Sequence, residues 1–133
     1  MLNKKKTIVI IDDDIDIQDL LSAYFKPKGF EVICFVDAEA AIEESLSTGV
    51  HWDVLLTDLQ LPKMSGVELT QQIKKSLPNL PIILITASTS AEVAVEAIEN
   101  GAYDYIVKPL HFPQLLISVQ RALHFNTLRG DIS

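Results

Sequence analysis

Short apolar runs recur along the chain and alternate with longer amphipathic segments. Several of these runs are continuous stretches of isoleucine, valine and leucine rather than stretches in which apolar and polar residues alternate. Continuous runs of this length are typical of strands buried on both faces, as in a parallel sheet. The expected strands are residues 7–11, 30–36, 52–57, 80–85 and 103–107.

The segments between and after these runs have the spacing and the end signals of helices. The expected helices are residues 15–26, 38–47, 65–77, 89–101 and a last helix with Pro113 in its first turn. Asp37 is a suitable N-cap for the second helix. Ser65, with Glu68 three residues later, predicts a capping box for the third helix. Thr89 with Glu92 repeats that signal for the fourth helix.

Strand and helix therefore alternate five times along the chain. Such alternation predicts a doubly wound α/β domain, in which helices cover both faces of a five-stranded parallel sheet. Ligands of such domains bind beyond the carboxyl ends of the strands. We expect residues 1–125 to form this domain and residues 126–133 to be a C-terminal tail or the start of a linker.

Composition and charge exclude several classes of protein. The net charge of −7 disfavours binding of this domain to nucleic acid or to an anionic membrane surface. No apolar run approaches the roughly 20 residues needed to span a membrane. The apolar run after the N-terminal lysines meets Asp12 too soon for a secretion signal. Because the single cysteine also rules out an internal disulfide, we expect a cytoplasmic protein.

Ionisable and hydroxyl residues stand where the expected strands end. Asp12 and Asp13 directly follow the first strand, and Asp58 follows the third. Thr86 and Lys108 follow the fourth and fifth strands. Because the carboxyl ends of parallel strands meet at one edge of the sheet, we expect these side chains to converge there.

The acidic residues at this edge suggest a metal site. Three carboxylates within about 5 Å of one another would repel by about 3 kcal/mol per pair at an effective dielectric constant near 20. A bound cation or a proton relieves this repulsion, and oxygen ligands suit Mg²⁺ or Mn²⁺. The alternative is that Asp12 to Asp14 only cap the first helix. We assign that capping role to Asp14 and the metal-binding role to Asp12 and Asp13.

Asp58 has two interpretations that depend on its partner Lys108. The simpler one is a salt bridge between the two side chains. The other is a carboxylate nucleophile that attacks phosphorus, with the metal ion and Lys108 neutralising the transferred phosphoryl group. Lysine serves as a point charge for phosphate. The Thr86 hydroxyl can donate a hydrogen bond to a phosphoryl oxygen, and the small Ala87 leaves access to it.

The order of these residues resembles the receiver domains of two-component response regulators. The resemblance covers Lys6 to about Phe125. Its motifs are Asp12-Asp13 after a strand, the segment from Asp58 to Gly66 that includes Pro62, the pair Thr86-Ala87, and Tyr105-Ile106-Val107-Lys108-Pro109. It implies a flavodoxin-like fold with strand order 2-1-3-4-5.

The resemblance also implies roles for individual residues. Asp58 would be the phosphorylation site, and Lys108 would pair with the phosphoryl group. Mg²⁺ would be bound directly by Asp13, by Asp58 and by the backbone carbonyl of Gln60, with Asp12 acting through water.

Further implications of the resemblance concern the backbone and the switch. The Lys108–Pro109 bond would be cis. Thr86 would move toward the phosphoryl group, and Tyr105 would turn inward into the vacated space. Residues 93–105 are similar to the corresponding part of NtrC-type activators.

The expected activity is signalling rather than catalysis on a substrate. A sensor histidine kinase, a phosphotransfer protein or a small donor would phosphorylate Asp58, and only slow autodephosphorylation would follow. The face formed by the helix near residues 91–100, the fifth strand and the last helix would then contact an output domain or effector. Transcription is the expected output, and this face could also form a homodimer.

Two other functions compete with this interpretation. The pair Asp12 and Asp14 resembles the nucleophile motif of haloacid-dehalogenase phosphohydrolases, which also use an aspartyl-phosphate intermediate. That motif requires threonine or valine where this chain has Asp16. A nucleotide- or flavin-binding module would place a glycine-rich or hydroxyl-rich loop after the first strand, where three acids here would repel phosphate.

Overall fold

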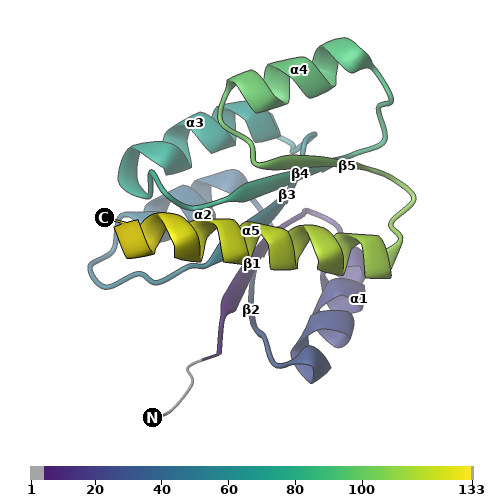
Figure 1. The fold of residues 1–133 in the computed structure, drawn as a ribbon. Coiled ribbons are helices and arrows are strands. Elements are labelled where there is room, and N and C mark those ends of the chain that lie inside the picture. Colours follow the sequence, from purple (N-terminus) through teal and green to yellow (C-terminus); the bar gives the residue numbers. More distant parts are fainter. Residues whose placement is uncertain (1–4, 133) are drawn as a thin grey trace.

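The computed structural model describes the backbone of residues 5–132 and the side chains of residues 5–125 (Figure 1). The elements are β1 (Thr7–Ile11), α1 (Ile15–Phe25), the 3₁₀ turn η1 (Lys26–Lys28), β2 (Glu31–Phe35), α2 (Ala38–Ser45), β3 (Val54–Asp58), α3 (Gly66–Ser76), β4 (Ile82–Thr86), α4 (Ala91–Glu99), β5 (Asp104–Val107) and α5 (Phe112–Ile132). The five expected strands and the five expected helices are therefore confirmed, with ends that differ by a few residues.

The strands form one parallel sheet in the order β2-β1-β3-β4-β5. The chain first moves outward from β1 to β2 and then crosses back to place β3 on the other side of β1. The direction of winding therefore changes between β1 and β3. Ile11, the last residue of β1, lies opposite Thr57, so Asp12 and Asp58 follow neighbouring strands at the same level.

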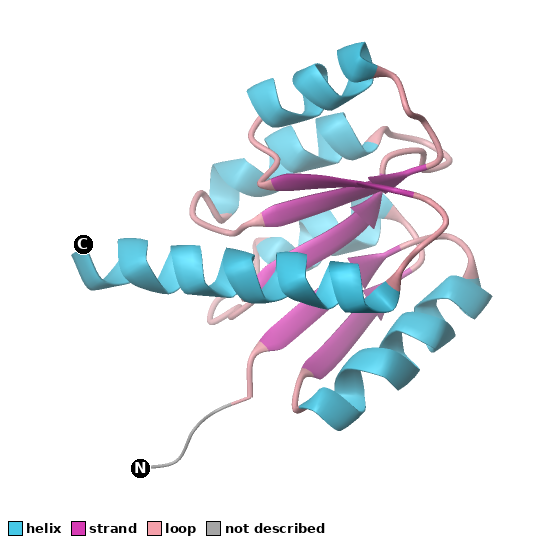
Figure 2. Ribbon diagram, turned by 45° about the vertical axis from the view of Figure 1, so that its right-hand side comes forward, coloured by secondary structure: helices cyan, strands magenta, loops and turns pink. Residues whose placement is uncertain are grey.

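Helices cover both faces of the sheet (Figure 2). Side chains alternate between the faces along each strand, so an apolar residue at every position is buried. One face packs α2, α3 and α4 against a core that includes Val9, Ile11, Leu55, Ile82 and Leu84. The other packs α1 and α5 against Ile8, Ile10, Leu56, Ile83 and Ile106. This double burial explains why the strands are continuous apolar runs.

Helix starts agree with the sequence signals in three places and differ in one. Asp14 caps α1, Asp37 caps α2, and Ser65 with Glu68 forms the capping box of α3, as predicted. The predicted cap of α4 at Thr89 is wrong, because the N-cap is Ser90, whose side chain accepts from the Val93 amide. The Ser90 amide donates to the Ser88 hydroxyl, and this turn delays the helix by one residue.

The last helix extends further than the sequence suggested. α5 continues to Ile132 and projects past the sheet (Figure 2), so the backbone of residues 126–132 is helical. A helix can continue here because the segment contains no proline. The domain limit at residue 125 stays a prediction. In the described part of the chain, no helix is long and apolar enough to cross a membrane.

Candidate functional site

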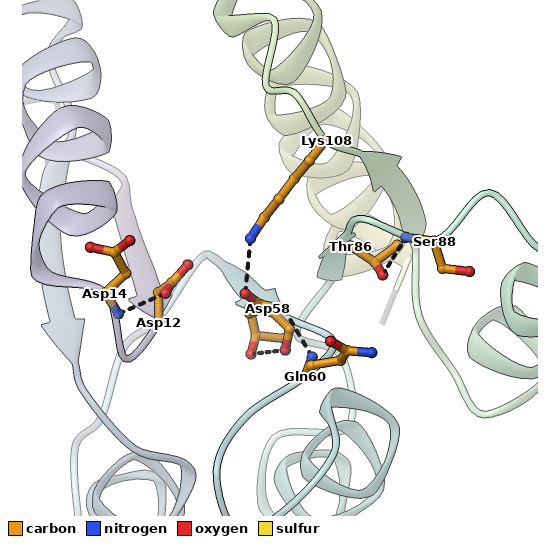
Figure 3. A network of polar contacts seen from close by, with 8 residues as sticks. Asp12, Asp14, Asp58, Gln60, Thr86, Ser88 and Lys108 are labelled. Carbon is orange, nitrogen blue, oxygen red and sulfur yellow. Dashed lines mark hydrogen bonds and ion pairs between the residues drawn. The ribbon is translucent and has the colours of Figure 1, made fainter.

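The predicted site residues from β1, β3 and β5 meet at the carboxyl edge of the sheet (Figure 3). The β1–α1 loop carries Asp12, β3 ends at Asp58, and Lys108 follows β5 and reaches across toward Asp58. The Lys108–Pro109 peptide bond is cis, as predicted. The edge therefore brings together acids and a lysine that are far apart in the sequence.

Asp58 is held by two donors. Its Oδ2 atom lies 3.0 Å from the Lys108 Nζ atom, and its Oδ1 atom accepts a 2.9 Å hydrogen bond from the Gln60 amide. The Asp58 side chain is 13% exposed and that of Lys108 is 33% exposed. A carboxylate that is mostly covered but keeps some exposure at a strand end can meet an incoming group, so the ion pair and a phosphoryl acceptor are compatible.

Asp12 is the most deeply placed acid of the site. It is 6% exposed, and its Oδ1 atom accepts a 2.9 Å hydrogen bond from the Asp14 amide. Burial raises the pKa of Asp12 above its ordinary value, and the charges of Asp58 and Asp13 raise it further. The Asp14 amide and Lys108 oppose this rise in pKa without cancelling it. Burial is therefore the main reason that the charged form of Asp12 is disfavoured, and the neighbouring acids add to it.

The donors that this edge offers to a cation are oxygen atoms, which suit a hard divalent ion. Among the described residues, no three carboxylate, imidazole or thiol side chains stand close enough to hold a metal ion together. The side chains therefore do not form a preformed cage of three acids, and the metal ligands named from the sequence stay a prediction. That predicted set has only two direct carboxylates, Asp13 and Asp58, beside the carbonyl of Gln60, so it does not require a cluster of three. A cation would also relieve the smaller part of the rise in the Asp12 pKa, which comes from the charges of Asp58 and Asp13 rather than from burial.

Thr86 belongs to a second chain of polar contacts beside Asp58 (Figure 3). Thr86 is 1% exposed, and its Oγ1 atom accepts a 3.1 Å hydrogen bond from the Ser88 amide. The Tyr105 hydroxyl donates a 2.6 Å hydrogen bond to the Ser88 carbonyl. A threonine hydroxyl that accepts one bond keeps its own hydrogen for donation, so Thr86 can still donate to a phosphoryl oxygen.

Tyr105 is partly buried. Its ring packs against the core between the sheet and α2, α3 and α4. An inward turn of Tyr105 is therefore not needed to form its bond to Ser88. Ala87, beside Thr86, is exposed and leaves the approach to the site open, as its small size suggested.

Two residues that shape the site were missed in the sequence analysis. Gln18 is buried on α1, and its amide bonds to the backbone at the ends of β1 and β2. A polar residue on the apolar face of an expected helix, one turn before Leu21, was the available signal. Gly66 is the second, because an added Cβ would lie 2.8 Å from the Asp58 carbonyl oxygen. The close approach could not be read from the sequence.

The doubly wound parallel sheet places this chain in the class of α/β domains that bind ligands at the carboxyl edge, where the direction of winding changes. Acids and one lysine lie at that edge here. The chain belongs to the response regulator receiver domain family, whose profile matches residues 8–120.

Comparisons with known proteins agree with this assignment. The chain is 35% identical over 125 residues to the regulatory protein AtoC of Escherichia coli K12, covering 94% of this chain and 27% of AtoC. It therefore spans about a quarter of the length of that relative.

Solved structures agree as well. The CheY-like receiver domain protein of Methanospirillum hungatei JF-1 superposes with a TM-score of 0.87 at 29% identity, covering 95% of this chain and 99% of that one. The beryllofluoride-activated NtrC4 receiver domain dimer gives 0.83 at 26% identity, covering 90% and 98%. The predicted similarity to NtrC-type activators is thus confirmed, because AtoC and the NtrC4 receiver domain belong to that group.

Proposed function

We propose that Asp58 accepts a phosphoryl group from a sensor histidine kinase, a phosphotransfer protein or a small donor, and that the modified domain controls an output. The observation that carries this proposal is the 3.0 Å contact between Lys108 Nζ and Asp58 Oδ2 at the carboxyl edge. A strand-end carboxylate with one fixed ammonium group beside it suits an incoming phosphoryl group, whose charge exceeds that of the carboxylate.

In the proposed step, an Asp58 carboxylate oxygen forms a bond to the donor's phosphorus atom. The bond between phosphorus and the donor nitrogen or oxygen breaks, and its electron pair leaves with the donor. Lys108 neutralises the oxygens of the transferred group as a fixed charge, since its Nζ atom already lies against Asp58.

Asp13, Asp58 and the backbone carbonyl of Gln60 would hold Mg²⁺ or Mn²⁺, with Asp12 acting through water. The ion would supply positive charge to the phosphoryl oxygens. On this proposal Asp12 positions water rather than attacking phosphorus. Its buried carboxylate, bonded to the Asp14 amide, suits that role better than the nucleophilic role in the phosphohydrolase alternative.

The proposed switch runs from Thr86 through Ser88 to α4. Thr86 would donate its hydroxyl hydrogen to a phosphoryl oxygen and move toward Asp58, and Ser88 would follow because its amide is bonded to Thr86. Tyr105 would respond through the Ser88 carbonyl. A phosphoryl group can shift the conformation only by binding the two states differently, and the Thr86 bond supplies that difference.

The α4-β5-α5 face is the surface that we propose to bind an output domain, an effector or a second copy of the chain. It exposes Val95 and Ile98 on α4 and Ile117 on α5, each about half exposed. The similarity to the NtrC4 receiver domain dimer supports the homodimer. Transcription is the output that we propose, because relatives such as ZraR are named transcriptional regulatory proteins.

A donor protein would dock on the groove between α1 and the start of α5. The groove has a volume of about 290 Å³ and is lined by Ile17, Leu20, Leu21, Lys108, Pro109, Leu110 and Phe112. Lys108 lines this groove and also contacts Asp58, so a protein docked in the groove would lie next to Asp58. Leu20→Lys should slow transfer from the kinase while leaving labelling by acetyl phosphate unchanged, and equal loss with both donors would contradict this docking site.

The direct test of the proposed function is labelling with acetyl phosphate and Mg²⁺, followed by intact-mass spectrometry. The parent chain should gain one phosphoryl group, and Asp58→Ala should gain none. Asp37→Ala, which removes a partly exposed acid that caps α2, is the matched control and should be labelled normally. Undiminished labelling of Asp58→Ala, with loss in Asp12→Ala, would favour the phosphohydrolase alternative.

A second experiment tests the switch. Amide chemical shifts recorded with and without beryllofluoride should change throughout residues 86–105. Changes limited to the immediate surroundings of Asp58 would show that the domain does not signal through α4 and β5.

A further inference from the structure

Gln18 is a buried polar residue in the first turns of α1, on the face that packs against the sheet. It is 7% exposed, whereas the other buried residues of this helix, Leu21 and Phe25, are apolar. A buried amide is destabilising unless its hydrogen-bonding groups find partners. Both hydrogens of the Gln18 side-chain amide have an acceptor in the structure, so the amide is bound in a fixed orientation.

The Gln18 side chain joins the ends of two strands. Its Nε2 atom donates to the Asp12 carbonyl and to the Phe35 carbonyl, both at 2.9 Å. The Asp12 amide also donates to the Phe35 carbonyl at 3.2 Å. The chain leaving β1 is therefore tied to the last residue of β2 by its own backbone and, through Gln18, by the first turns of α1.

The carbonyl that Gln18 holds belongs to the peptide unit between Asp12 and Asp13. A peptide unit is planar, so fixing the direction of its oxygen fixes the plane on which both α-carbons lie. Asp13 is exposed and precedes the helix, so the backbone sets its position. Gln18 therefore fixes one of the two peptide units that set the position of the Asp13 α-carbon.

We propose that Gln18 is a positioning residue for the divalent cation, which it serves by orienting the Asp12–Asp13 peptide unit. The role rests on the proposed function, because it needs the cation site that Asp13 and Asp58 would form. Residues that orient metal ligands from behind typically change metal affinity by about ten-fold or more when they are replaced.

Gln18→Met tests the role, since methionine has a similar length and shape but no hydrogen to donate. We expect the Mg²⁺ concentration that half-saturates the amide shifts of Asp13 and Asp14 to rise about ten-fold. Labelling of Asp58 by acetyl phosphate should need the same increase in Mg²⁺ and should recover at high Mg²⁺. An unchanged Mg²⁺ affinity in the folded variant would overturn the proposal.

Two control variants separate positioning from general stability. Ser22→Ala removes the contact between Ser22 Oγ and Cys34 Sγ, which also ties α1 to β2 but leaves the acidic loop alone. Gln71→Met makes the same substitution at a glutamine on α3 that bonds to Asn100. Neither should change Mg²⁺ affinity. A loss in Ser22→Ala equal to that in Gln18→Met would mean that attachment of α1, rather than the peptide unit, matters.

A measurement on the parent chain needs no substitution. The resonances of the Gln18 side-chain amide should shift as Mg²⁺ is added, in step with the Asp13 backbone amide. A Gln18 amide that stays constant while Asp13 responds would overturn the role of Gln18 alone. If the parent chain shows no Mg²⁺ response that Asp13→Asn abolishes, the proposed metal site fails, and the role of Gln18 fails with it.

Discussion

α3 and α4 lie on the same face of the sheet but are held very differently. α3 buries residues along its whole length, including Leu69 and Ile73, which are fully covered. α4 buries only Ala97 and leaves Val95 and Ile98 half exposed. Each covers part of one common core, so the difference lies in the size and depth of the side chains that each helix contributes.

The start of α3 is also held by more hydrogen bonds than the start of α4. α3 begins with a reciprocal capping box, and the amide of its first residue, Gly66, donates a 2.6 Å bond to the Leu59 carbonyl. α4 begins with a single side-chain cap, the 3.4 Å bond from the Val93 amide to Ser90. α3 therefore holds the segment that follows Asp58 rigidly, whereas α4 has few contacts to resist movement. Elements that move in switching are drawn from such weakly held parts of a fold.

The largest expected effect is a difference in the free energy of unfolding when isoleucine is replaced by alanine in α3 and in α4. Ile73→Ala in α3 should lower the free energy of unfolding by about 2–5 kcal/mol, because it leaves a cavity in the core. Ile98→Ala in α4 should change it by less than about 0.5 kcal/mol, because that side chain is half exposed. Urea unfolding of both variants measures the contrast, and equal losses would show that α4 is packed as firmly as α3.

Gly66→Ala should give the next largest effect. An added Cβ would lie 2.8 Å from the Asp58 carbonyl oxygen and 2.9 Å from the Leu59 α-carbon, so backbone must shift. We expect a loss of about 1–3 kcal/mol in urea unfolding. The Leu84 side chain also lies 2.9 Å from the added atom, yet adding Leu84→Val should not restore stability. Full rescue would mean that the clash is with that side chain alone.

Removing the two caps should give a smaller difference. Ser65→Ala breaks both bonds of the capping box and should cost about 1 kcal/mol. Ser90→Ala removes one long bond at a loosely packed end, so global stability should change less, and amide hydrogen exchange should accelerate mainly at Val93 and its neighbours. A loss in Ser90→Ala as large as that in Ser65→Ala would contradict the contrast between the helices.

The smallest expected effect is a change in melting temperature when Asp12 is replaced. The folded-state pKa of Asp12 is raised, so the folded protein holds this proton to higher pH than the unfolded chain does. The group therefore disfavours the folded state as pH rises through its folded pKa. In the absence of Mg²⁺, Asp12→Asn should melt at a higher temperature than the parent near neutral pH.

The same variant provides its own controls. The difference in melting temperature should shrink as pH falls and should vanish below about pH 3, where the carboxyl group is protonated in both states. Added Mg²⁺ should stabilise the parent more than the variant. A difference that stays constant from acid to neutral pH would show that the charge of Asp12 is not its cause.

The sequence by itself determined the order of elements and the identity of the residues at the strand ends. Continuous apolar runs predicted strands buried on both faces, and strand ends that carry Asp12, Asp58 and Lys108 predicted a shared edge. These inferences hold because periodicity and capping are local properties, and because parallel strands leave their carboxyl ends together. The receiver family followed from the same residues and their spacing.

Only the tertiary structure decided how closely those residues approach one another. Gly66 is needed because two backbone segments meet there, and Gln18 carries an amide because two carbonyls from different strands face it. The start of α4 at Ser90 depends on a hydrogen bond to Ser88 in the preceding turn. The separation of the carboxylates likewise depends on how the β1–α1 loop is held. Contacts between distant segments have no signature in local sequence, because they arise only when the sheet brings those segments together.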